Sequence, residues 1–121
     1  MSKHVLLIDD EANIRELLAI ALQGKGYRVT AAASADEAQM TVRKDPPDLI
    51  ISDLQLEDED GLAIIAQLKT TLPNVPVILL TGVLFDPQVV RENLSKKVSC
   101  YLEKTSSLSK ITDTIKRLLE E

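Results

Sequence analysis

The stretch VLLIDDE, residues 5–11, places four apolar residues directly before three acidic ones. A short, uninterrupted apolar run is typical of a β-strand that is covered on both faces, as strands of parallel sheets are. Similar runs recur along the whole chain, and together they predict five strands at Val5–Ile8, Val29–Ala33, Leu49–Ser52, Val75–Leu80 and Cys100–Leu102.

The segments between these runs have the apolar spacing of amphipathic helices, with residues recurring at intervals of three and four. Glycines and prolines mark where the helices stop or start. The predicted helices are one over Ile14–Leu22 that stops at Gly24 and Gly26, one that opens with a capping box at Ser34–Glu37, one that follows Gly61 and ends before Pro73, one that starts near Pro87, and one over Leu108–Leu119.

Five strand–helix repeats predict an α/β fold, a doubly wound five-stranded parallel sheet flanked by five helices. A chain of 121 residues fits one domain of this kind and is too short for an eight-fold barrel. Doubly wound sheets bind their ligands beyond the carboxyl ends of the strands. We therefore expect the functional residues at that edge, and none at His4, which precedes the first strand at the opposite edge.

Residues of matching chemistry stand at the predicted strand ends. Asp9 and Asp10 follow the first strand, Asp53 the third, Thr81 the fourth and Lys104 the fifth. Two carboxylates 4 Å apart repel by about 4 kcal/mol at an effective dielectric constant of 20, so such a cluster favours a bound cation. Oxygen ligands without His or Cys suit Mg²⁺, and a lysine and a hydroxyl can hold phosphoryl oxygens. The set points to phosphoryl transfer with an aspartate as nucleophile.

Each residue also has an ordinary structural explanation. The Asp9–Asp10 pair could cap the next helix, and Asp53 could be an acidic loop residue. Thr81 could be a common strand-end hydroxyl, and Lys104 a solvated lysine. Their coincidence at four strand ends favours a site.

These motifs resemble the receiver domain of two-component response regulators. The resemblance covers about Val5 to Leu119, and it rests on Leu7–Glu11, Pro47–Asp53, Asp60–Gly61, Leu80–Gly82 and Tyr101–Lys104. It implies the flavodoxin-like strand order 2-1-3-4-5 and a single receiver domain over residues 1–121. Thr105 and Glu57 stand where the family usually has proline, and residues 56–60 form an unusually acidic loop.

The resemblance implies that Asp53 is the phosphoacceptor, charged by a sensor histidine kinase or a phosphotransfer protein. It implies a Mg²⁺ site in which Asp10 and Asp53 are ligands, Asp9 is a ligand through water, and Gln55 contributes its backbone carbonyl. The chain would then catalyse only its own phosphorylation and dephosphorylation, and would not be an enzyme for an external substrate.

The resemblance also implies a switch. Lys104 would pair with Asp53 and then with its phosphoryl group, while Thr81 would turn inward to bond a phosphoryl oxygen. Tyr101 would be the aromatic residue that follows Thr81. The helix near Pro87, the strand at residues 100–102 and the helix at residues 108–119 would form the surface for an effector or for a homodimer.

Composition excludes several other classes of function. The net charge is −5 and only three residues are aromatic, so a nucleic-acid-binding surface is not expected. The single cysteine, Cys100, cannot form an internal disulfide, and no signal peptide or membrane span is apparent, so we expect a cytoplasmic protein. Two alternatives stay open: a Mg²⁺-dependent phosphohydrolase with an aspartyl-phosphate intermediate, and a receiver-like interaction module that is never phosphorylated.

Overall fold

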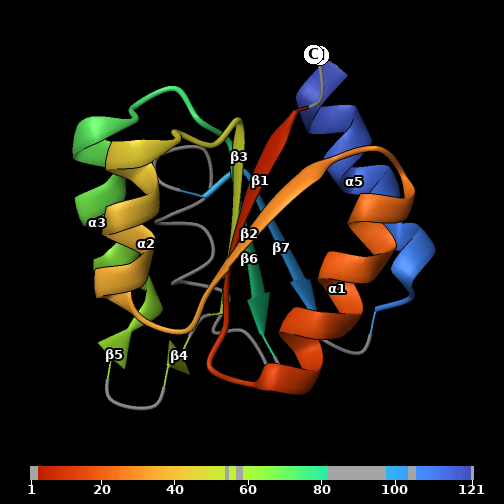
Figure 1. Ribbon diagram of the computed structural model, residues 1–121, viewed down its shortest axis with the longest axis horizontal. Helices are drawn as coiled ribbons and strands as arrows, with labels where there is room; N and C mark the ends of the chain where they lie inside the picture. The colour runs from red at the N-terminus through yellow and green to blue at the C-terminus, as the bar shows by residue number, and fades with distance from the viewer. Residues whose placement is uncertain (1–2, 54, 57–58, 82–97, 104–105, 121) are drawn as a thin grey trace.

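Five parallel strands form the central sheet of the computed structural model, which describes residues 3–53, 55–56, 59–81, 98–103 and 106–120 (Figure 1). The strands are β1 (His4–Ile8), β2 (Arg28–Ala32), β3 (Leu49–Asp53), β6 (Val77–Thr81) and β7 (Cys100–Glu103). Their order across the sheet is β2-β1-β3-β6-β7, and every neighbouring pair is parallel. This confirms the predicted doubly wound sheet and the order 2-1-3-4-5.

Helices cover both faces of the sheet. Helices α1 (Ala12–Gly24) and α5 (Leu108–Glu120) lie on one face, and α2 (Ala35–Lys44) and α3 (Gly61–Thr71) lie on the other (Figure 1). The expected helix near Pro87 falls outside the described residues. Among the helices that are described, none is long and apolar enough to span a bilayer.

Strand β1 shows why the apolar runs are continuous. Leu6 and Ile8 pack into the cluster beneath α2 and α3, whereas Val5 and Leu7 pack into the cluster beneath α1 and α5. All four side chains are fully buried. Because successive side chains of a strand point to opposite faces, a strand that is covered on both faces needs apolar residues at every position.

Helix α1 ends at the glycines that the sequence marked. Gly26 adopts a positive φ of 95°, a conformation that glycine accepts without steric cost. The Tyr27 N–H donates to the Leu22 carbonyl at 3.2 Å, and the Gly26 N–H donates to the Gln23 carbonyl at 3.0 Å. This is the Schellman pattern, which satisfies the last carbonyls of the helix.

Helix α2 begins with the predicted cap. The Ser34 hydroxyl accepts from the Glu37 N–H at 3.3 Å. The Glu37 carboxylate in turn accepts from the Ala33 N–H at 2.8 Å. Because this bond engages Ala33, β2 ends at Ala32, one residue earlier than predicted.

Strand β6 begins two residues later than the apolar run from Val75 suggested. The Val75 N–H donates to the Leu72 carbonyl at 3.4 Å in the turn that follows α3. Pro76 has no N–H to give to a strand ladder, and only its carbonyl takes part, accepting from Ile50 at 3.0 Å. Regular pairing therefore starts at Val77.

The acidic segment after β3 contains two short strands. Residues Gln55–Leu56 (β4) pair antiparallel with Glu59–Asp60 (β5) immediately before α3. Alternation of apolar residues gives no signal over two-residue strands, so the sequence did not predict this hairpin.

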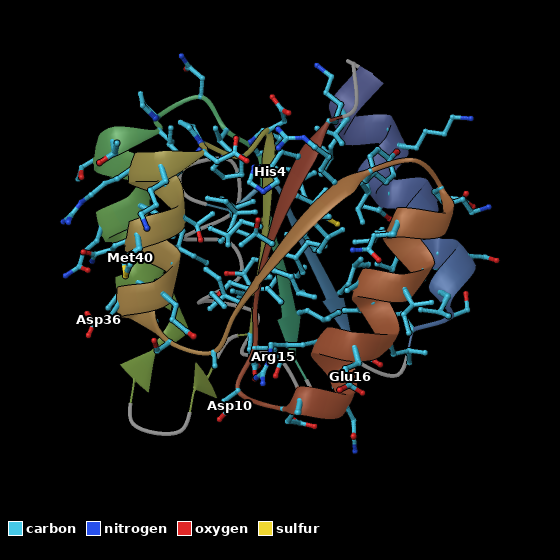
Figure 2. The ribbon with its side chains drawn as sticks, viewed as in Figure 1. His4, Asp10, Arg15, Glu16, Asp36 and Met40 are labelled. Carbon is cyan, nitrogen blue, oxygen red and sulfur yellow. The ribbon has the colours of Figure 1, made fainter. Side chains whose placement is uncertain are left out.

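His4 lies at the opposite end of β1 from the acidic residues, as predicted (Figure 2). Its side chain is buried, and its Nε2 lies 2.7 Å from the Thr30 hydroxyl of β2. Its backbone N–H donates to the Asp48 carboxylate at 2.8 Å. These contacts join β1 to β2 and to the segment before β3, so the contacts of His4 support the fold.

Candidate metal centre

Four carboxylates meet at the carboxyl ends of the two central strands. Strands β1 and β3 are neighbours, with Ile8 opposite Ser52, so Asp9 and Asp53 occupy equivalent positions at the edge of the sheet. Carboxylate oxygens of Asp9, Asp10, Glu11 and Asp53 all lie within 4.8 Å of one another. We call these four residues the acidic cluster. The structure thus brings together the three aspartates that the sequence selected and adds Glu11.

Burial differs within the acidic cluster. Asp9 is only 1% exposed and Asp53 only 6%, whereas Asp10 is half-buried and Glu11 is exposed. The buried pair therefore sits in the less polar part of the cluster, where charges are screened weakly by solvent. Asp10 and Glu11 border the solvent side.

Backbone and side-chain bonds fix Asp9 from several directions. Its N–H donates to the Ala32 carbonyl of β2 at 3.1 Å. Its carboxylate Oδ1 accepts from the Glu11 N–H at 2.9 Å, and its carbonyl accepts from Nη1 of Arg15 at 2.6 Å. Arg15 belongs to α1 and was not predicted as a site residue. A charged residue six positions after Asp9 was the only signal, and it is equally typical of a solvated helix face.

The donor set of the acidic cluster fits Mg²⁺. Its ligand atoms are all carboxylate oxygens, which hard divalent cations prefer, and no His or Cys belongs to it. Two charges 4.8 Å apart repel by about 3.5 kcal/mol at an effective dielectric constant of 20. A divalent cation would turn this repulsion into attraction, since each carboxylate would face opposite charge.

The other predicted site residues lie on the same edge or beyond the described chain. Thr81 ends β6, one residue after Leu80, which is opposite Asp53. Gln55 begins β4, two residues after Asp53. Lys104 lies outside the described residues and directly follows Glu103, whose register partner is Thr81.

Tyr101 lies in β7 opposite Leu79 and is half-buried against the cluster beneath α2 and α3. Burial raises the pKa of its phenol above the ordinary value, which further favours the neutral form. Its position beside β6 is compatible with the switch role that the resemblance implied.

The family comparison decides the class of this site. A model of the response regulator receiver domain matches residues 5–116. The chain belongs to the response regulator receiver domain family. Receiver domains are the signalling modules of two-component systems, so the predicted family is confirmed.

Two curated relatives show the context in which such receiver domains occur. The chain is 37% identical over 79 residues to the transcriptional regulatory protein GlrR of Escherichia coli K12, an alignment that covers 65% of this chain and 18% of the relative. It is 40% identical over 78 residues to the virulence transcriptional regulatory protein PhoP of Salmonella typhimurium 14028s, covering 64% and 35%. The alignments thus span only about a fifth to a third of these relatives.

Solved structures confirm the receiver fold over nearly the whole chain. A CheY-like receiver domain protein from Methanospirillum hungatei JF-1 superposes with a TM-score of 0.91 at 23% identity, covering 99% of this chain and 95% of that one. The chemotaxis protein CheY4 of Vibrio cholerae superposes with a TM-score of 0.90 at 26% identity, covering 98% and 100%.

Proposed function

We propose that this receiver domain is a phosphoacceptor switch in which Asp53 takes a phosphoryl group from the phosphohistidine of a sensor histidine kinase or a phosphotransfer protein. The observation that supports this is the gathering of four carboxylates within 4.8 Å, with Asp53 buried at the end of a central strand. Clustered carboxylates repel one another, and a bound cation offsets that repulsion.

The proposed step is a transfer between two nucleophiles. A carboxylate oxygen of Asp53 attacks the phosphorus, and the phosphorus–nitrogen bond of the phosphohistidine breaks. The released imidazole nitrogen keeps the bonding electron pair and takes up a proton. Later, water attacks the phosphorus of the acyl phosphate, which releases inorganic phosphate and restores the Asp53 carboxylate. The chain acts only on itself in both steps.

Mg²⁺ is the cofactor that the acidic cluster would hold. Asp10 and Asp53 would be carboxylate ligands, Asp9 would act through water, and Gln55 would offer its backbone carbonyl. When bound, Mg²⁺ supplies positive charge to the phosphoryl oxygens. The contribution of the chain is to hold the carboxylates in place before the reaction, because Asp9 and Asp53 are buried at the carboxyl ends of adjacent strands.

Two further residues would carry the signal away from the site. Lys104 would bind Asp53 and then a phosphoryl oxygen, and the Thr81 hydroxyl would bind another. Tyr101 would follow the movement of Thr81. Their positions support this, because Thr81 and Glu103 are paired at the ends of β6 and β7 and Lys104 comes next.

The partner surface would comprise α5, the β7 edge of the described sheet and the segment around Pro87. An effector or a second copy of the chain would read its change. In keeping with a kinase partner and a single free cysteine, Cys100, we expect the domain to act in the cytoplasm.

The test is phosphorylation by a small donor such as acetyl phosphate in Mg²⁺, followed by intact-mass spectrometry. The wild type should gain one phosphoryl group, Asp53→Asn should gain none, and wild type in EDTA should gain little. Asp113→Asn, the same change at an exposed carboxylate of α5, should behave as wild type.

The same assay distinguishes the two alternatives. Equal uptake by wild type and Asp53→Asn would remove Asp53 as acceptor. No uptake by either would favour the interaction module. Steady turnover of phosphate esters would favour the phosphohydrolase.

A further inference from the structure

Arg15 connects helix α1 to the backbone of the acidic cluster. Its side chain is half-buried, and its Nη1 donates to the Asp9 carbonyl at 2.6 Å. Its backbone N–H donates to the Glu11 carbonyl at 3.1 Å in the first turn of α1. Figure 2 shows Arg15 and Asp10 at the same end of the molecule. One residue of α1 therefore holds both ends of the short segment from Asp9 to Glu11.

The bond from Arg15 orients the peptide unit that leads into Asp10. The Asp9 carbonyl and the Asp10 nitrogen belong to one planar peptide group, so fixing the carbonyl fixes the direction in which the chain enters Asp10. The Asp9 N–H is already held by β2. With the N–H and the carbonyl of Asp9 both fixed, the side chains of Asp9 and Asp10 extend from a backbone of defined orientation.

This support does not use up a metal ligand. Arg15 bonds a neutral carbonyl, and it makes no ion pair with a carboxylate among the described residues. Glu11, at the N-cap of α1, makes no side-chain capping bond. The Arg15 bond and the bond between the Asp9 carboxylate and the Glu11 N–H both lie at the turn between β1 and α1.

We infer that Arg15 is a positioning residue that raises the affinity of the acidic cluster for a divalent cation by holding the Asp9–Asp10 peptide. This inference rests on the proposed function, because it assumes that the cluster binds Mg²⁺. The direction in which Mg²⁺ affinity changes on removal of the Arg15 side chain distinguishes positioning from a charge effect. The positive charge of Arg15 alone would repel Mg²⁺, so removing the side chain tightens binding if charge dominates and weakens binding if positioning dominates.

The test is the dissociation constant for Mg²⁺, measured by isothermal titration calorimetry without a phosphodonor. Arg15→Met keeps the unbranched apolar stem and removes the donors and the charge. We expect it to weaken Mg²⁺ binding by about 10-fold, the lower end of what loss of a supporting residue costs in metal sites. Arg15→Lys keeps a donor and the charge, and its Mg²⁺ affinity should lie between those of wild type and Arg15→Met.

Arg28→Met is the matched control. It removes the same charge at the opposite end of the sheet, where Arg28 bonds Asp45 at 2.7 Å, and it should leave Mg²⁺ affinity unchanged. Urea unfolding in EDTA checks that Arg15→Met is folded, and Arg15→Lys carries the test if it is not.

The outcomes separate the two proposals. If wild type binds Mg²⁺ and Arg15→Met binds it equally or more tightly, the role of Arg15 is refuted and the proposed function stands. If wild type itself does not bind Mg²⁺, both are refuted. Equal weakening by Arg15→Met and Arg28→Met would show that the loss does not depend on contact with the Asp9 carbonyl, and it would also refute positioning.

Discussion

Replacing Asp53 by asparagine should make the metal-free protein more stable, although Asp53 is the residue on which the proposed function depends. Asn keeps the size and shape of Asp and removes its charge. Asp53 and Asp9 are 6% and 1% exposed, and their oxygens lie within 4.8 Å. Two unit charges at that distance repel by about 3.5 kcal/mol at an effective dielectric constant of 20. Unfolding separates the charges, so the repulsion counts against the folded state alone.

Part of this repulsion is offset by hydrogen bonds to the carboxylates, such as the one from the Glu11 N–H to Asp9, and by the proposed pairing of Lys104 with Asp53. We therefore expect Asp53→Asn to raise the free energy of unfolding in EDTA by about 1–3 kcal/mol. With a urea m-value of about 2 kcal/mol/M, the midpoint should rise by roughly 1 M. Asp113→Asn, at an exposed position of α5, should change stability by less than about 0.5 kcal/mol.

Magnesium should stabilise wild type and Asp53→Asn to different extents. A ligand at 10 times its dissociation constant stabilises the native state by about 1.4 kcal/mol, so Mg²⁺ should stabilise wild type more than Asp53→Asn. Urea titrations of the three proteins, in EDTA and in Mg²⁺, measure both effects. If Asp53→Asn is as stable as wild type or less stable in EDTA, while Asp113→Asn is neutral, the charges of the acidic cluster do not oppose folding and the reasoning is refuted.

Three further predictions concern stability. A hydrogen bond from the Arg28 guanidinium holds the pKa of Asp45 below its ordinary value of 3.8, so the pair stabilises the fold above that pH and its contribution is lost as the pH falls through the lowered pKa. Asp45→Asn should therefore make the urea midpoint less dependent on pH between about pH 5 and 2, and a pH dependence equal to that of wild type would contradict this. His4→Ala should cost about 2–4 kcal/mol in urea unfolding because it empties a buried site and strands the Thr30 hydroxyl, and a double-mutant cycle with Thr30→Val should show coupling rather than additivity. Gly26→Ala should lower the free energy of unfolding by about 1 kcal/mol because residue 26 has a φ of 95°. Gly24→Ala, which also has open space around it, should leave thermal stability unchanged or raise it, and a larger loss of stability for Gly24→Ala than for Gly26→Ala would contradict this.

The sequence predicted the sheet well because its signals are local and redundant. Val5–Ile8 must be apolar at every position when both faces are covered, and burial of all four side chains confirms it. Gly26 and Ser34 mark helix ends through their own backbone and side-chain chemistry. Prediction failed where the signal is short or competes with another bond, as at the hairpin of Gln55–Leu56 and Glu59–Asp60.

The site was predicted as a set of residues at strand ends but not as a set of contacts. Parallel topology alone brings Asp9 and Asp53 to one edge, so their proximity follows from the fold. The participation of Glu11 depends on how the chain turns into α1, and the contact of Arg15 with the Asp9 carbonyl depends on one side-chain conformation. Neither is encoded by a periodic pattern, so only the structure shows them.

The central claim is that Asp53 carries the phosphoryl group, and the most direct measurement locates that group on the chain. The protein would be phosphorylated with acetyl phosphate in Mg²⁺ and reduced with borohydride, which converts an aspartyl phosphate into homoserine. Peptide mass spectrometry would then identify the modified position. We predict homoserine at residue 53 alone, and none after incubation in EDTA. Homoserine at Asp9, Asp10 or another carboxylate, or at no position after demonstrated phosphate uptake, would contradict the account.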